Sequence, residues 1–105
     1  MRLSRRTLVF GLAATSLAGQ ATKECVWERR VYAAGSDVPP PAVLRRNGIH
    51  VESIRHTQRG AEYLIAFDSL ASRSRAWDRF NTDPAWCAIR GQGNVRLHEI
   101  VVIPD

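Results

Sequence analysis

The stretch AEYLIAFDSLASRSRAWDRF, residues 61–80, decides the fold because it joins a strand directly to a helix. Residues 61–67 form a nearly continuous apolar run that is typical of a central β-strand. Asp68 and Ser69 follow, and short side chains with an oxygen are preferred just before the first turn of a helix. The helix that we expect next has one face formed by Leu70, Ser74, Trp77 and Phe80.

The remaining sequence supplies the other elements of a small α+β domain. Residues 49–55 alternate between apolar and polar side chains, and the turn at 57–60 joins them to 61–67 as a β-hairpin. In chain order, the expected elements are a strand at 25–32, a short helix at 42–46, strands at 49–55 and 61–67, helices from Leu70 and from Pro84, and a strand at 95–103. In the last strand, alternation places five residues on one face: Val95, Leu97, Glu99, Val101 and Ile103. This β-α-β-β-α-β order predicts a ferredoxin-like fold with an antiparallel sheet.

Composition favours a small globular domain over the other broad classes of protein. The chain has 105 residues, 45% of them hydrophobic, with 15 basic against 10 acidic side chains. Spanning a bilayer needs about 18 consecutive apolar residues, and the sequence has no such run. Three of the arginines lie within residues 2–6, so the rest of the chain has only a small positive surplus. We therefore expect no membrane span after processing and no nucleic-acid partner.

The N-terminal residues have the pattern of an export signal. Arg5 and Arg6 precede an apolar stretch at 8–18, and small residues follow it. The paired arginines match the twin-arginine motif that an export receptor reads. We expect a signal peptide at residues 1–21, cleavage before Gly19 or Thr22, a mature domain at 22–105, and a periplasmic or otherwise extracytoplasmic location.

The cysteines of the chain are Cys25 and Cys87. Exported proteins often pair their cysteines. Here, however, Cys25 stands at the start of the first strand, whereas Cys87 lies beyond the helix that leads back along the sheet. A strand such as 26–32 is roughly 23 Å long, and a disulfide needs Cα atoms about 4.4–6.8 Å apart. We expect no disulfide between the two within one chain, and a bridge between two chains stays open.

Three stretches of the sequence resemble NIPSNAP-family domains. VWERRVY, residues 26–32, resembles that family's opening strand, with Arg29 in place of the usual Leu. Residues 67–73 resemble its strand-to-helix junction, and AWDRFNTDPAW, residues 76–86, resembles its later helical segment with an Asp-Pro-x-Trp element. The resemblance covers Cys25 to Pro104. It implies the dimeric α+β barrel type of fold, in which two ferredoxin-like sheets face one another across a two-fold axis, and it implies a homodimer more firmly than a reaction.

Glu28, Arg30 and Tyr32 are the first candidates for ligand binding. They project from one strand face at period two, and such an acid–base–phenol row can bind a small polar ligand or supply a general base. The alternative is a structural ion pair between Glu28 and Arg30. We favour this alternative because charges on buried strands are usually each other's partners.

His50 and His98 are the second pair of candidate ligand-binding residues. Unperturbed histidine titrates near neutrality, and Glu52 on the same strand face can orient His50. The alternative, which we favour, is that both are surface or hydrogen-bonded histidines. The spacing of histidines and cysteines matches no metal site, no cofactor motif is present, and no catalytic residue can be assigned.

Two functions fit these expectations. One is the binding of a small molecule in a barrel pocket, with an activity of the oxygenase or isomerase type by analogy with related barrels alone. The other is a non-enzymatic protein-interaction module of the cell envelope. A pocket that joins Arg30, Tyr32 and a histidine would favour the first, and a sheet face with only aliphatic side chains would favour the second. We expect homodimerisation through the open sheet face, because a domain this small buries only a modest share of its surface alone.

Overall fold

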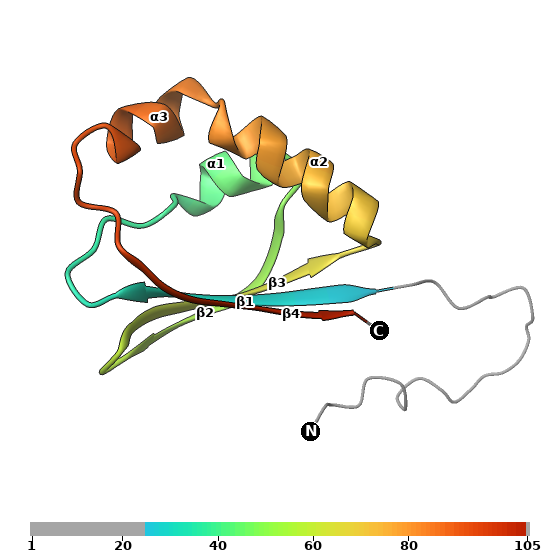
Figure 1. Ribbon diagram of the computed structural model, residues 1–105, viewed down its shortest axis with the longest axis horizontal. Helices are drawn as coiled ribbons and strands as arrows, with labels where there is room; N and C mark the ends of the chain where they lie inside the picture. Colours follow the sequence, from blue (N-terminus) through green and yellow to red (C-terminus); the bar gives the residue numbers. More distant parts are fainter. Residues whose placement is uncertain (1–24, 105) are drawn as a thin grey trace, which may run out of the picture.

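The computed structural model describes residues 25–104, so the expected signal peptide at 1–21 lies outside the described residues (Figure 1). The elements are β1 (Val26–Ala33), α1 (Pro41–Arg46), β2 (His50–Thr57), β3 (Gly60–Phe67), α2 (Leu70–Asn81), α3 (Pro84–Arg90) and β4 (Leu97–Pro104). The strands form one antiparallel sheet in the order β2-β3-β1-β4. The predicted α+β class and its ferredoxin-like antiparallel sheet are confirmed.

The helices all lie on one face of the sheet, which we call the helix face (Figure 1). The opposite face, the open face, carries no helix within residues 25–104. The core fills the helix face, where aromatic rings dominate the packing. Trp77 and Phe80 of α2 meet edge to face at 5.5 Å between ring centroids, and Phe80 stacks on Trp86 of α3 at 4.9 Å. These three side chains are buried, as the helical spacing predicts.

Side-chain caps begin two of the helices where the sequence predicts them. The hydroxyl of Ser69 accepts a hydrogen bond from the backbone N–H of Ser72 (3.0 Å), and the Ser72 hydroxyl accepts one from the Ser69 N–H (3.1 Å). This reciprocal pair satisfies donors that the first turn of α2 leaves free. At α3, the carboxylate of Asp83 accepts from the Ala85 N–H (2.9 Å), with Pro84 at the first helical position.

Leu70 departs from the expected pattern. It lies on the same side of α2 as Trp77, yet 52% of its surface is exposed. It is the first residue of α2, and the part of this helix that is buried against the sheet begins only at Ala76. The expectation that Leu70 belongs to the packed face is therefore wrong.

A β-bulge changes the predicted faces of β4. Glu99 pairs with Val31, but Leu97 pairs with Tyr32, so His98 is an extra residue opposite β1. Directly opposed residues in an antiparallel pair share a face. Leu97 therefore lies with Tyr32 on the helix face, while Glu99 lies on the open face. The predicted single row that joins Leu97 to Glu99 is wrong, because strict alternation does not survive an inserted residue. Val95 lies before β4, which begins at Leu97.

The two cysteines lie in different parts of the fold. Cys25 directly precedes β1, Cys87 lies within α3, and these parts of the chain lie at opposite ends of the sheet (Figure 1). Within the described residues, no disulfide joins Cys25 to Cys87. The Cys87 thiol instead lies 3.4 Å from the backbone oxygen of Asn81. The expectation of no disulfide within one chain rests on this separation of Cys25 from Cys87.

We predict that Gly60→Ala destabilises the domain far more than Gly93→Ala. Both glycines have positive φ, +132° and +80°. A Cβ at Gly60 would also collide with the backbone oxygen of Tyr32, whereas one at Gly93 would meet no atom within 4 Å. In urea unfolding followed by tryptophan fluorescence, we expect a loss of more than ~2 kcal/mol for the first and about 1 kcal/mol for the second. Equal losses would contradict the tight approach of β3 to β1.

Candidate functional site

Glu28 lies at the centre of a buried polar cluster between β1 and α2. Its side chain is fully buried. The carboxylate accepts hydrogen bonds from Arg30 Nε (2.6 Å), Arg73 Nε (2.7 Å) and Trp77 Nε1 (2.8 Å). The predicted ion pair between Glu28 and Arg30 is therefore present, and α2 adds two donors that the sequence pattern did not indicate.

The cluster holds Glu28 as a carboxylate. Burial alone raises the pKa of this group, but the hydrogen bond from Arg73, the charge of Arg30 and the remaining donors outweigh it and hold the pKa below the usual value. The guanidinium carbon of Arg30 also lies 3.7 Å from the centroid of the Trp77 ring, a cation–π contact. An acid that is ionised and surrounded by donors is poorly placed to serve as a general base, so this cluster is structural.

Tyr32, the third residue of the predicted row, packs rather than binds. Its ring meets the ring of Tyr63 edge to face at 5.5 Å. The Tyr63 hydroxyl donates to the backbone oxygen of Pro39 (2.9 Å). Burial raises the pKa of Tyr32, and burial together with Tyr32 raises the pKa of Tyr63 to about 12. Both phenols stay neutral in the physiological range.

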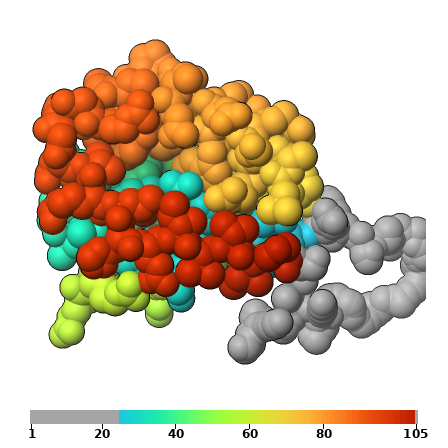
Figure 2. Space-filling model, viewed as in Figure 1, coloured from blue at the N-terminus to red at the C-terminus, as the bar shows by residue number. Residues whose placement is uncertain are grey.

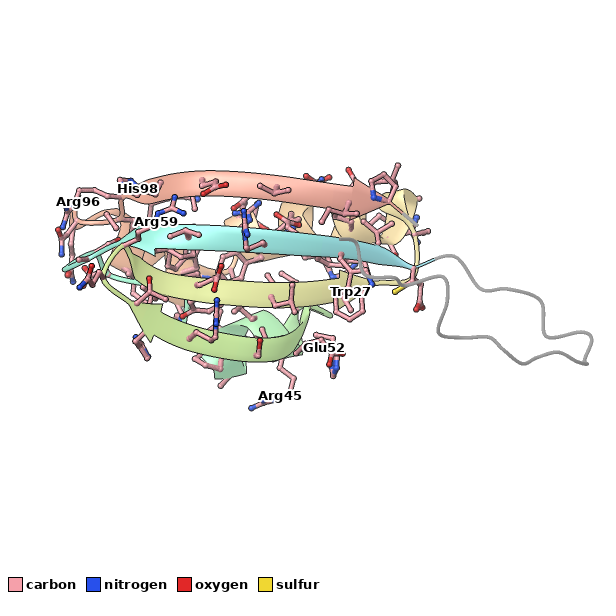
Figure 3. The ribbon with its side chains drawn as sticks, turned by 90° about the horizontal axis from the view of Figure 1, so that it is seen from below. Trp27, Arg45, Glu52, Arg59, Arg96 and His98 are labelled. Atoms are coloured by element: carbon pink, nitrogen blue, oxygen red, sulfur yellow. The ribbon has the colours of Figure 1, made fainter. Side chains whose placement is uncertain are left out.

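The two candidate histidines lie on the two opposite edge strands of the sheet, and His98 is next to Leu97, the residue that pairs with Tyr32. His50 opens β2, where its Nε2 lies 2.9 Å from a carboxylate oxygen of Glu52, as the sequence suggested. His98 is the bulge residue of β4, and Figure 3 shows it near Arg96 and Arg59 at one end of the sheet. Because β2 and β4 are the two edge strands, the sheet does not bring His50 and His98 together in one site.

The open face instead carries a row of five charged side chains, contributed by all four strands and by the turn between β2 and β3; we call it the charge ladder. Arg55 of β2 lies 2.6 Å from Glu62 of β3. Arg29 of β1 lies between two carboxylates, 3.7 Å from Glu62 and 3.0 Å from Glu99 of β4. Arg59, in the turn between β2 and β3, reaches the other oxygen of Glu99 at 2.6 Å. The hydrogen bonds from Arg59 and Arg29 hold the pKa of Glu99 below its usual value, against the effect of burial.

Two shallow hollows lie along the ladder. One, of about 260 Å³, is lined by Arg29, Ser53, Arg55, Glu62 and Leu64. The other, of about 360 Å³, is lined by Val31, Arg55, Thr57, Gln58, Arg59 and Glu62. Both share Arg55 and Glu62, so the hollows adjoin at the β2–β3 side of the ladder. The larger hollow falls within the range of roughly 300–1,000 Å³ that is typical of ligand pockets, and the smaller one lies just below it.

Apolar side chains continue the open face beyond the ladder. Trp27 pairs with Ile103 of β4, and Arg29 pairs with both Leu64 and Val101, so all of these side chains share the face. Ile103 is 42% exposed. The open face therefore combines a charged row with an adjoining apolar area.

Sequence reasoning missed the ladder, although part of its signal was present. The alternation of Trp27, Arg29 and Val31 already placed Arg29 on the face opposite Glu28. The partners of Arg29 come from strands far away in the sequence, and only the strand register brings Glu62 and Glu99 to it.

Comparison with known proteins adds no assignment for this surface. No protein-family model matches the chain, and no curated protein matches it. Within residues 25–104, no cluster of three or more side chains is suited to hold a metal ion. The described helices are all too short or too polar to cross a membrane.

We predict that Glu28→Gln lowers the free energy of unfolding by about 3 kcal/mol at pH 7, because the variant leaves two partly buried guanidinium groups without their counter-charge. The exposed Glu52→Gln is the matched control, with a change within about 0.5 kcal/mol. Urea unfolding of both variants and the parent chain gives the comparison.

The parent chain and Glu28→Gln also give a test of pH dependence. A carboxylate with a depressed pKa stabilises the fold above its ordinary pKa of 4.5, and this stabilisation is lost as pH falls through the folded-state value. The difference between the parent chain and Glu28→Gln should therefore narrow below pH 4.5. Arg46 and Asn47 also hold the pKa of Asp83 well below its usual range, but Asp83 is present in both proteins and its contribution cancels. A difference that is constant from pH 7 to pH 3 would contradict the assigned charge state.

Proposed function

We propose that this chain is an exported, NIPSNAP-like domain that forms a homodimer of the dimeric α+β barrel type and binds a small molecule between its two open faces. The observation that carries the proposal is the open face itself. It is a four-stranded surface without a helix over it in the described chain, and it combines the charge ladder, adjoining hollows and an apolar area. The resemblance of residues 26–32 and 76–86 to NIPSNAP domains supports the same assembly.

Exposed apolar side chains gather along the edge strand β4, which favours a partner at this edge of the sheet. The large apolar side chains that are most exposed are Leu70, Leu97, Ile100 and Ile103, and all but Leu70 belong to β4. Ile103 lies on the open face, whereas Leu97 and Ile100 pair with residues of the helix face. β4 is an edge strand, and it lies uncovered along the front of the molecule in Figure 2. An exposed apolar edge strand is a surface that proteins usually cover.

A second copy of this chain has the charges that fit the open face. The ladder alternates in sign across the sheet, from Arg55 to Glu62, Arg29, Glu99 and Arg59. A two-fold partner presents the same alternation, so a small lateral offset sets arginines opposite glutamates. A purely aliphatic face, which would favour the alternative of a protein-interaction module, is not what β1 and β3 present.

We predict that Leu64→Lys dissociates the dimer, because it adds a cation beside Arg29 at the centre of each open face and raises the net charge of the ladder region from one positive charge to two. The dimer dissociation constant should rise at least ~100-fold, since both copies carry the new charge. Leu70→Lys makes the same change on α2, at a side chain that is already 52% exposed, and should leave the dimer intact. Light scattering at tens of micromolar measures the mass of each protein.

Native mass spectrometry of the parent chain tests the complete proposal, because it reports subunit number and retained ligand together. A dimer that carries extra mass, lost in Leu64→Lys, is the expected result. A monomeric parent chain would refute the barrel-type assembly. A dimer that survives Leu64→Lys but not Leu70→Lys would move the interface to the helix layer.

A further inference from the structure

We propose that the ligand of the open face is a small monocarboxylate with a flat apolar body, bound in the hollow that Arg29 and Arg55 line. This inference rests on the proposed function, since it concerns the same face, and it names the ligand's chemical class. Three observations carry it: the charge balance of the ladder, the unused donors of its arginines, and the apolar side chains beside the hollow.

The ladder is one negative charge short of neutrality. It holds three guanidinium groups, those of Arg29, Arg55 and Arg59, against the two carboxylates of Glu62 and Glu99. One bound carboxylate therefore neutralises the row, whereas a dianion would leave it negative. In a two-fold dimer each ladder carries one excess positive charge. Enclosing the two faces removes water from these charges, so each then needs a counter-charge.

Some N–H donors of the ladder arginines have no hydrogen-bond partner within the described residues. Arg29 makes a hydrogen bond through Nη2, to Glu99, and its Nη1 makes none within the described residues. Arg55 directs Nε and Nη2 at the same oxygen of Glu62 and leaves its Nη1 without a partner in that part of the chain. Both guanidinium groups line the hollow of about 260 Å³, beside the hydroxyl of Ser53. Arginine recognises planar carboxylates through paired N–H donors, so this wall fits a carboxylate better than a neutral amide.

The part of the ligand outside its carboxylate can pack against apolar side chains. Leu64 lines the same hollow, and the register places Leu64 and Val101 on either side of Arg29. The carboxylate of Glu62 also lines the hollow and repels a second anion, which sets a limit of one charged group. A carboxylate at one end and a flat apolar body at the other thus match the two halves of the surface.

Benzoate and benzamide test this inference as a matched pair of probes, because they share size and shape and differ in charge. Isothermal titration calorimetry of the full chain should give at least ~10-fold tighter binding for benzoate, and Arg55→Gln should weaken benzoate by ~10-fold or more with little effect on benzamide. Arg75→Gln is the control. It removes the same charge from an exposed α2 side chain that makes no ion pair within the described residues.

The outcomes separate the inference from the proposed function. Equal binding of the two probes, no binding of either, or equal weakening by Arg55→Gln and Arg75→Gln would overturn the carboxylate site. Light scattering on the same samples reports the dimer independently. A dimer without benzoate preference refutes the inference alone, and a monomer with Arg55-dependent benzoate binding refutes the assembly alone.

Discussion

The packing of α2 against the sheet depends on the buried carboxylate of Glu28. A charge without access to water is tolerated only when hydrogen-bond donors surround it, and here they come from β1 and from α2. Trp77 donates to this carboxylate, and its ring also contacts Phe67 and Phe80. A single ionised group thus fixes the position of the helix and the orientation of the aromatic core. The helix face is closed as a result.

The pleat of β1 distributes two different roles to adjacent residues. Glu28 and Arg30 point to the helix face, where the Glu28 carboxylate accepts hydrogen bonds from Arg30 and from Arg73. Arg29 points to the open face, where it lies between carboxylates of two neighbouring strands. Exposed ion pairs contribute little to stability one at a time. The ladder is therefore better understood as a means of orienting guanidinium groups than as a stabilising device.

Local features of the sequence were enough to predict most of the fold. Ser69 and Pro84 mark helix starts through chemistry that acts over three residues or fewer, and the hairpin of β2 and β3 follows from alternation and a short turn. The site depends on register, which a single sequence does not encode in a readable way. The donors of Glu28 on α2, the partners of Arg29 and the bulge at His98 all arise from pairings between distant segments. That is why the predicted row of Glu28, Arg30 and Tyr32 is present, whereas the contacts that Arg73, Trp77 and Tyr63 make with it could not be predicted.

The two charged clusters differ in what balances their surplus of arginine. Around Glu28, two guanidinium groups meet one carboxylate, and the face of the Trp77 ring lies against Arg30. An aromatic face attracts a cation, so the protein itself supplies part of the missing negative potential. In the ladder, Arg29 makes one side-chain hydrogen bond within residues 25–104, to Glu99, and its Nε lies 3.7 Å from Glu62. The same excess of one arginine is thus compensated internally on the helix face, whereas on the open face it is left to a group from outside the domain.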